Sequence, residues 1–222
     1  MSMRSAALLV LIIIITTLLS GCNNSADIFS IHQNKKKYIG IQPLGEYNKE
    51  RLNFVREQIT HFYRTPVIIL PPIPLPKSFI NRQKGERYCA DSILLFLKAL
   101  KNDSIVEVVG LVHKDIYTTK KDRNGNIQQP VAKYAVWGIC GLGYLPGDEC
   151  IISDMRLKTK DSAVFKRRLK TVVIHEIGHN LGLPHCKVKG CIMSDTNEKV
   201  ATLDNSRNDY CNECKLKLKW KF

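Results

Sequence analysis

A histidine motif in the second half of the chain restricts its fold more than any other feature. His175 and His179 lie inside a segment with helical character, and residues four apart share one face of a helix. Both imidazoles can therefore reach a single metal ion, as the pattern His-Glu-x-x-His requires. Glu176 projects from a neighbouring position, where its carboxylate can reach a water on the metal without binding the metal itself.

The residues that follow extend this motif to His-Glu-x-x-His-x-x-Gly-x-x-His. A continuing helix would carry residue 185 away from the metal, but Gly182 can adopt a left-handed conformation that ends the helix. Pro184 prevents the helix from resuming, so His185 can return as a third ligand. The alternative is that His185 is a solvent-exposed histidine and Gly182 an ordinary helix cap. Three protein nitrogens leave the fourth position of a zinc ion open, as in catalytic sites.

The extended motif resembles that of the metzincins, whose signature includes a methionine turn further along the chain. Met193, eight residues after His185, stands where that methionine would lie beneath the metal. The cysteines narrow the resemblance to the archaemetzincin family of zinc metallopeptidases, in which four cysteines bind a second, structural zinc ion. The cysteines concerned are Cys186, Cys191, Cys211 and Cys214. The similarity is close over residues 175–214 and looser over residues 108–115 and 134–157.

The resemblance implies a single metzincin-like α/β domain over residues 37–222. Its mixed, mostly parallel, twisted sheet is packed by helices, and an antiparallel edge strand, which we place at residues 134–140, lines the substrate cleft. The active-site helix leads into a small cysteine-rich part at residues 186–214 that holds the structural zinc.

The same resemblance implies a zinc-dependent metallopeptidase that acts on a peptide or protein substrate. His175, His179 and His185 hold the catalytic zinc, and Glu176 is the general base for a zinc-activated water. With the structural site, the chain would bind two zinc ions. The alternative is a membrane-tethered, catalytically silent zinc-binding module, although a site that only binds metal has no need of a base.

The residue types alone leave two interpretations open for the four cysteines. A Cys-x4-Cys pair followed by a Cys-x2-Cys pair forms a credible tetrahedral thiolate site for zinc. An oxidising compartment would instead favour disulfides. Among the remaining cysteines, Cys140 and Cys150 could close a glycine-rich loop as a disulfide, and Cys89 is expected to be a buried free thiol.

The N-terminus resembles a bacterial lipoprotein leader. Residues 1–21 combine a positive charge at Arg4 with an almost unbroken apolar run, and Leu19-Ser20-Gly21-Cys22 is similar to a lipobox. Cleavage there makes Cys22 the lipidated first residue, followed by a tether over residues 22–36. We therefore expect an extracytoplasmic protein, lipid-anchored to a bacterial membrane. The alternative is an uncleaved membrane anchor, since the apolar run is about as long as a short spanning helix.

Hydrophobic periodicity predicts alternating strands and helices before the histidine motif, which indicates an α/β sheet. We expect strands at residues 38–42, 66–70, 105–112, 134–140 and 150–153, and helices at residues 47–63, 86–101 and 161–181. The first strand is expected to stop at Pro43. Four prolines between residues 71 and 76 predict an extended loop, and polar residues 118–133 predict a surface loop.

The chain carries a formal net charge of +14. Its lysines are scattered and no nucleic-acid-binding motif accompanies them, so we expect no nucleic-acid partner. The first interpretation of this charge is a solvated basic surface without a specific partner. Among partners, anionic lipid, a cell-surface polymer or an acidic substrate would suit such a surface better than nucleic acid. The alternating tail at residues 215–222 predicts an edge strand or, alternatively, a segment that contacts the membrane. Nothing in the sequence indicates an oligomeric state.

Overall fold

A computed structural model describes residues 37–195 and 200–218 of the chain. The predicted leader, the tether and Cys22 lie outside the described residues, as do the last four residues of the alternating tail. In the described ranges, no helix combines the length and the apolar character that crossing a membrane requires.

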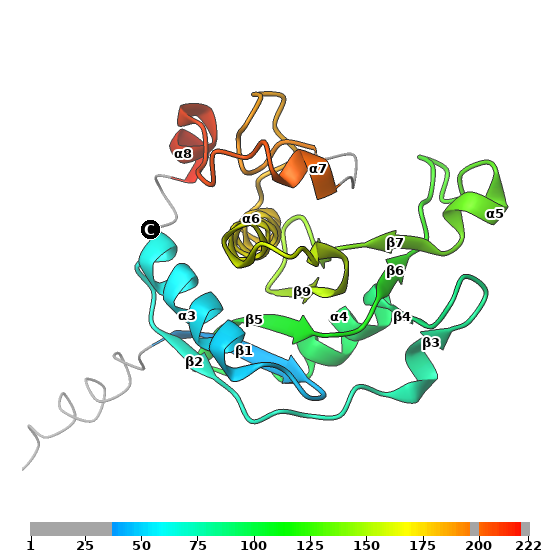
Figure 1. The fold of residues 1–222 in the computed structure, drawn as a ribbon, viewed down its shortest axis with the longest axis horizontal. Coiled ribbons are helices and arrows are strands. Elements are labelled where there is room, and N and C mark those ends of the chain that lie inside the picture. Colours follow the sequence, from blue (N-terminus) through cyan, green and yellow to red (C-terminus); the bar gives the residue numbers. More distant parts are fainter. Residues whose placement is uncertain (1–36, 196–199, 219–222) are drawn as a thin grey trace, which may run out of the picture. The chain divides into compact units, whose positions relative to one another are not determined.

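A five-stranded sheet forms the centre of the fold (Figure 1). Its strands are β1 (Tyr38–Leu44), β2 (Val67–Ile69), β5 (Ile105–Val112), β8 (Gly141–Gly143) and β9 (Glu149–Ser153), arranged in the order β2-β1-β5-β9-β8. All neighbouring strands run parallel except β8, which is antiparallel to β9. β5 and β9 are buried almost throughout, as their continuous apolar runs predict for a parallel sheet. The predicted α/β fold with a mixed, mostly parallel sheet is confirmed.

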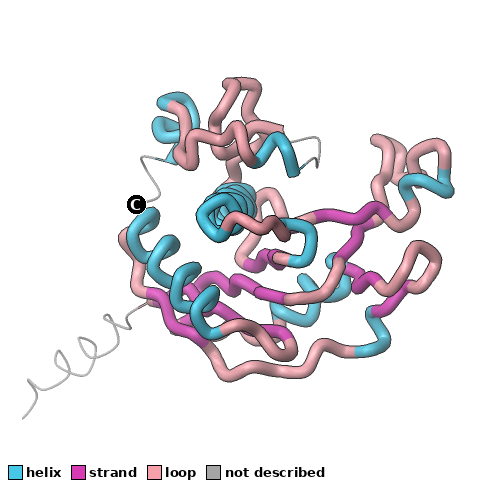
Figure 2. The backbone as a smooth tube through the Cα atoms, in the orientation of Figure 1, coloured by secondary structure: helices cyan, strands magenta, loops and turns pink. Residues whose placement is uncertain are grey.

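Helices cover both faces of this sheet (Figure 2). α3 (Lys49–Tyr63) and α6 (Ser162–Asn180) share one apolar core with the sheet, and α4 (Ala90–Lys98) shares the other. Side chains alternate along a strand, so the consecutive residues Val108 and Val109 of β5 belong to opposite cores. The sheet is therefore the middle layer of three.

α3 and α6 begin at the capping residues that precede them. The side chain of Asn48 accepts a hydrogen bond from the first turn of α3, and that of Asp161 accepts two from the first turn of α6. These bonds satisfy N–H groups that have no partner within the helix. The helices predicted at residues 47–63 and 161–181 are confirmed, with ends that differ by one or two residues.

A smaller sheet lies beside the main one and accounts for two corrections. Its strands are β3 (Ile80–Asn81), β4 (Arg87–Cys89), β6 (Ile116–Thr118) and β7 (Trp137–Ile139), in the order β3-β4-β6-β7. The helix predicted from residue 86 begins only at Ala90, because Tyr88 and Cys89 pair with β6. The strand predicted at residues 134–140 is the shorter β7, since Tyr134 still belongs to the helix α5 (Val131–Tyr134).

The antiparallel edge strand of the main sheet also differs from its predicted position. It is β8, whose ladder with β9 pairs Gly141 with Ile152 and Gly143 with Cys150. We had assigned this segment to a glycine-rich loop, because a short run with two glycines has no alternating pattern. Only the pairing with β9 makes it a strand.

The first strand continues through Pro43, where we expected it to stop. The carbonyl of Pro43 accepts a hydrogen bond from Ile73 N at 3.1 Å, on the side of β1 that faces away from β5. The nitrogen of Pro43 faces the same side as its carbonyl, where β2 has already ended, so the N–H that proline lacks is not needed there. Proline at such a position removes no bond from the ladder with β5. The proline segment itself contains no helix or strand, as predicted.

The C-terminal part contains two short helices, α7 (Val200–Leu203) and α8 (Asn212–Leu218). The edge strand predicted at residues 215–222 is therefore wrong as far as residue 218. A helical turn at this point brings Cys211 and Cys214, three residues apart, to one side of the chain, with Lys215 N bonded to Cys211 O at 3.0 Å. Two 3₁₀ turns complete the described elements, η1 (Lys77–Phe79) and η2 (Met155–Leu157).

The disulfide suggested between Cys140 and Cys150 is wrong, because the structure forms no disulfide between them. The carbonyl of Cys140 pairs with Ser153, three residues along β9 from Cys150. Three residues of a strand span about 10 Å, beyond the roughly 7 Å that a disulfide can bridge between Cα atoms. Cys89 is a free thiol as predicted, but it is only partly buried.

Candidate active site and metal centres

The histidine motif folds as its spacing predicts. His175 and His179 stand on α6, and Gly182 adopts a left-handed conformation with φ of 89°. Leu183 N then bonds back to Gly178 O at 2.9 Å, so the chain turns at the end of the helix. This turn brings the exposed His185 to the other two, with ring centroids 4.6 to 5.3 Å apart. The three side chains each offer a ligand atom within 4.8 Å of the others.

Backbone carbonyls orient the two helical histidines. Nδ1 of His175 lies 2.8 Å from Ile192 O, and Nδ1 of His179 lies 2.8 Å from Leu183 O. Each Nδ1 therefore donates to a carbonyl, which leaves Nε2 of each ring to face the common centre. Zinc-binding histidines are usually held this way, so the donor set fits zinc.

The pKa values of these histidines favour the form that binds metal. Burial, followed by the neighbouring His179, lowers the pKa of His175 to about 3. Burial also lowers the pKa of His179. Neutral imidazoles are the ligands that zinc requires, so both rings are in the binding form at neutral pH.

Glu176 is buried against the edge strand β8, with 7% of its surface exposed. A Cβ atom at Gly141 would lie 2.6 Å from Oε1 of Glu176, so only glycine lets the strand approach this carboxylate. Burial raises the pKa of Glu176 to about 8, against a hydrogen bond from the Gly143 backbone that lowers it. A carboxylate with a raised pKa accepts a proton more readily than an exposed one.

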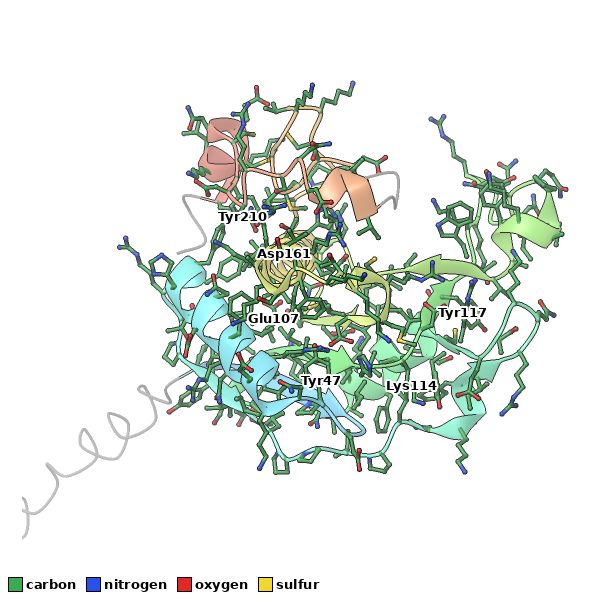
Figure 3. The ribbon with its side chains drawn as sticks, in the orientation of Figure 1. Tyr47, Glu107, Lys114, Tyr117, Asp161 and Tyr210 are labelled. Carbon is green, nitrogen blue, oxygen red and sulfur yellow. The ribbon has the colours of Figure 1, made fainter. Side chains whose placement is uncertain are left out.

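A second buried acid lies at the end of α6. Asn180 Nδ2 donates to Oε1 of Glu107 at 3.0 Å, and Asn180 O accepts from Gly147 N at 3.1 Å. Figure 3 labels Glu107. Burial raises the pKa of Glu107 to about 7. A Cβ atom at Gly143 would lie 2.9 Å from Asn180 Oδ1, so Asn180 also packs directly beneath β8.

Met193, the predicted methionine-turn residue, packs against α6 at Gly178, which lies between His175 and His179 in the sequence. It is fully buried, and a Cβ atom at Gly178 would lie 2.5 Å from its sulfur. Met193 O accepts a hydrogen bond from Cys186 N at 2.7 Å, which ties the methionine turn to the residue that follows His185. The buried Tyr210 hydroxyl, 3.2 Å from Ile174 O, lies on the same side of α6.

A cavity of about 630 Å³ opens above the histidines. Its lining includes Glu176, β8 and the three histidines, together with Thr118 at the end of β6 and Lys120. A cavity of this size is typical of sites that bind a small molecule or a few residues of a peptide. Of residues 134–140, predicted to line the substrate cleft, Ile139 and Cys140 do line this cavity, and Gly141, Leu142 and Gly143 of β8 extend the same wall.

The four cysteines form a second cluster. Their sulfur atoms all lie within 4.8 Å of one another. Sγ of Cys186 is 3.7 Å from that of Cys211, and Sγ of Cys191 is 3.8 Å from that of Cys214. Four sulfurs bound tetrahedrally to zinc at about 2.3 Å stand about 3.8 Å apart, whereas a disulfide joins sulfurs about 2 Å apart. The arrangement fits a tetrahedral metal ion and not a pair of disulfides.

Comparison with known proteins agrees with this geometry. The family model described as peptidase family M54 matches residues 48–220. The chain belongs to this family. An archaemetzincin of Methanocaldococcus jannaschii is 32% identical over 81% of this chain and 92% of its own length. One from Archaeoglobus fulgidus is 29% identical over 82% of this chain and 99% of its own length.

The crystal structure of the Archaeoglobus fulgidus archaemetzincin, complexed with malonate, has a similar fold. It is 26% identical, covers 81% of this chain and 99% of its own, and has a TM-score of 0.65. The predicted membership of the archaemetzincin family is thereby confirmed. As a member of family M54, the chain is a zinc metallopeptidase.

The structure also adds residues to this M54 site that the sequence motifs did not indicate. Gly141 and Gly143 shape the edge strand around Glu176, and Glu107 and Asn180 form a buried polar pair behind it. A glutamate inside an otherwise apolar strand, as Glu107 is in β5, was the signal available in the sequence.

Proposed function

We propose that this M54 member hydrolyses peptide bonds at the three-histidine site, with His175, His179 and His185 holding zinc and Glu176 as general base. One observation carries the proposal. Three histidine rings converge on one point at the wall of a cavity, and a buried carboxylate with a raised pKa lies beside them. Zinc bound there supplies a Lewis acid that polarises the substrate carbonyl and makes a coordinated water more acidic.

The residues of the chain supply the remaining steps. Glu176 takes a proton from the attacking water and delivers it to the amine that leaves. Gly143 N–H holds the carboxylate from the edge strand, so Glu176 keeps one position during both transfers. The β8 edge gives the substrate backbone a partner in extended conformation. The substrate class is therefore a peptide or a protein.

We further propose a second, structural zinc ion on Cys186, Cys191, Cys211 and Cys214, which makes two per chain. The distances between their sulfurs support this assignment. Val188 N lies 3.4 Å from Cys186 Sγ and Cys211 N lies 3.3 Å from Cys191 Sγ, as donors that stabilise thiolates would. Four protein ligands leave no open position, so this ion has no part in the chemistry.

The location of the protein is also a proposal. The apolar leader and the lipobox-like run before Cys22 support lipid anchoring outside the cytoplasm of a bacterium. Substrates would then be peptides or proteins of that compartment, and no nucleic acid is expected as a partner.

The test is the variant Glu176→Gln of the zinc-loaded chain, with Glu57→Gln on the exposed side of α3 as the matched control. We expect kcat/KM to fall by about 10²- to 10⁴-fold in Glu176→Gln, with zinc content and melting temperature close to those of the wild type. The control should cleave a peptide library at the wild-type rate. Equal turnover by Glu176→Gln and wild type would instead support the silent zinc-binding module.

A further inference from the structure

A second cavity lies at the carboxyl ends of the parallel strands, between the beginnings of α3 and α6. Its volume is about 550 Å³. From β1 the chain passes through α3 to β2, which lies on one side of β1 in the sheet, whereas β5 and β9 lie on the other side of β1. The strand order therefore reverses between β1 and β5. Open α/β sheets bind ligands in the crevice outside such a reversal. We name this cavity the switch-point crevice.

The switch-point crevice is basic. Arg51, His113, Lys158, Lys160 and Lys166 all line it. Within the described part of the chain, Lys158 and Lys160 are exposed and form no ion pair, whereas Lys166 lies 3.4 Å from Glu50. Two lysine charges on one short loop are therefore left for a ligand.

Among the described residues, the nearby acid Asp161 forms no ion pair with these lysines and instead caps α6. Its Oδ1 accepts hydrogen bonds from the first turn of α6, at 2.8 Å from Ala163 N (Figure 3). Because this cap and that of Asn48 already satisfy the helix termini, the side chains, and not the helix amides, would hold an anion.

A buried carboxylate holds two of the basic groups in place. Asp154 has no exposed surface, and it bonds to Arg51 Nη1 at 2.6 Å through Oδ2 and to His113 Nδ1 through Oδ1. The other guanidinium nitrogens of Arg51 remain as donors, and Nε2 of a neutral His113 is an acceptor because Nδ1 donates to Asp154. Groups that are held this way lose little side-chain entropy on binding.

Aromatic side chains complete the crevice. Phe54 and Phe165 line it together with Leu169, and the guanidinium carbon of Arg51 lies 4.4 Å from the ring centroid of Phe165. The ligand therefore needs an anionic end for the lysines and an apolar or planar part for these rings.

We infer that the switch-point crevice binds a soluble phosphate monoester that carries an apolar or planar group. Arg51, Lys158 and Lys160 contact the phosphoryl oxygens, and Phe54 and Phe165 contact the remainder. The site is separate from the histidines, because Ser162 precedes His175 by 13 positions along α6, a rise of about 20 Å. A lipid headgroup has the same phosphoryl chemistry, but the aromatic rings inside the cavity suit a soluble molecule whose planar group enters with its phosphate.

The experiment is calorimetric titration of the full, zinc-loaded chain in detergent with inorganic phosphate and with phenyl phosphate, at constant ionic strength. The test variant is Lys158→Glu/Lys160→Glu. The control is Lys77→Glu/Lys98→Glu, which changes the net charge equally at two exposed lysines away from the crevice. We expect both probes to bind wild type and control, with phenyl phosphate tighter. The test variant should bind at least about tenfold more weakly, since each lost lysine removes a charge-assisted hydrogen bond.

Three results would overturn the inference. Equally weaker phosphate binding in both double variants would mean that the net charge of the protein, and not the crevice, determines binding. Failure of both probes to bind would remove the site. If micelles doped with phosphatidylglycerol raise the melting temperature of the wild type but not of the test variant, while neither soluble probe raises it, the crevice binds a membrane headgroup instead. None of these results depends on peptidase activity, so they leave the proposed function untouched.

Discussion

The three-histidine site and the four-cysteine site meet in sequence, since His185 and Cys186 are consecutive, yet they are built differently. Two histidines stand on α6, a helix of 19 residues, and face a cavity of about 630 Å³. The cysteines stand on turns and on the short helix α8, and two of the four are buried. Three ligands beside a cavity leave room for a substrate, whereas four ligands enclose an ion completely.

This difference separates what the two sites contribute. The helix is already packed against the sheet, so the histidines are held in place by the fold around them. The described residues 186–195 and 200–218 contain only short helices and turns, so the proposed structural zinc would supply much of their stability. We therefore expect damage to the first site to remove activity and damage to the second to remove structure.

The largest expected effect is on activity. His179→Ala should lower kcat/KM by at least about 10³-fold, because a metal that polarises the substrate is worth several kcal/mol in the transition state. Zinc content should fall from two ions per chain to one. His61→Ala, at an exposed position of α3, is the control. Retained activity with one zinc ion would break the comparison.

The next effect is on stability. Cys214→Ser should lower the free energy of unfolding by more than about 4 kcal/mol, as loss of a structural metal does, and should expose residues 186–218 to proteolysis. Cys89→Ser, at a partly buried free thiol, should change it little. Thermal melts with and without reductant complete the test. A wild-type melting temperature that falls with reductant would indicate disulfides in place of zinc.

A smaller effect concerns the buried acid behind the histidine site. The raised pKa of Glu107, about 7, means that burial destabilises its charged form, so its contribution to stability is full below pH 4 and is lost as pH rises through 7. Glu107→Gln keeps the bond from Asn180 and removes the charge. The free energy of unfolding of Glu107→Gln should equal that of the wild type at pH 4.5 and exceed it by about 3 kcal/mol at pH 8. Urea titrations at both pH values measure this, and an equal difference at both would contradict the buried charge.

The smallest effect tests how closely β8 fits Glu176. Gly141→Ala should lower kcat/KM by about 10- to 100-fold, because the new Cβ atom must displace the carboxylate. Gly40→Ala is the control, since its Cβ atom would meet only Ile105 and Leu70 in the same sheet. It should lower the melting temperature without changing kcat/KM. Similar losses of activity in both variants would mean that a general distortion of the sheet, and not displacement of Glu176, lowers kcat/KM.

Much of the metal site could be predicted from sequence because its spacing is local. Four residues along a helix, a glycine that ends it and a proline that prevents its return bring three histidines together without distant partners. Burial in parallel strands leaves long apolar runs, so β5 and β9 were also predicted. The two cysteine pairs indicated a common site, although residue types alone could not separate zinc from disulfides.

Only the tertiary structure decided the remainder. β8 and β4 became strands through their partners, in segments without a strand pattern, and α8 formed where alternation predicted a strand. The pairing of Glu107 with Asn180 joins residues 73 positions apart, and the switch-point crevice joins the beginnings of α3 and α6 with His113, which follows β5. Local spacing determined which residues could bind zinc. Long-range pairing determined what surrounds them, because contacts between distant segments leave no periodic trace in the sequence.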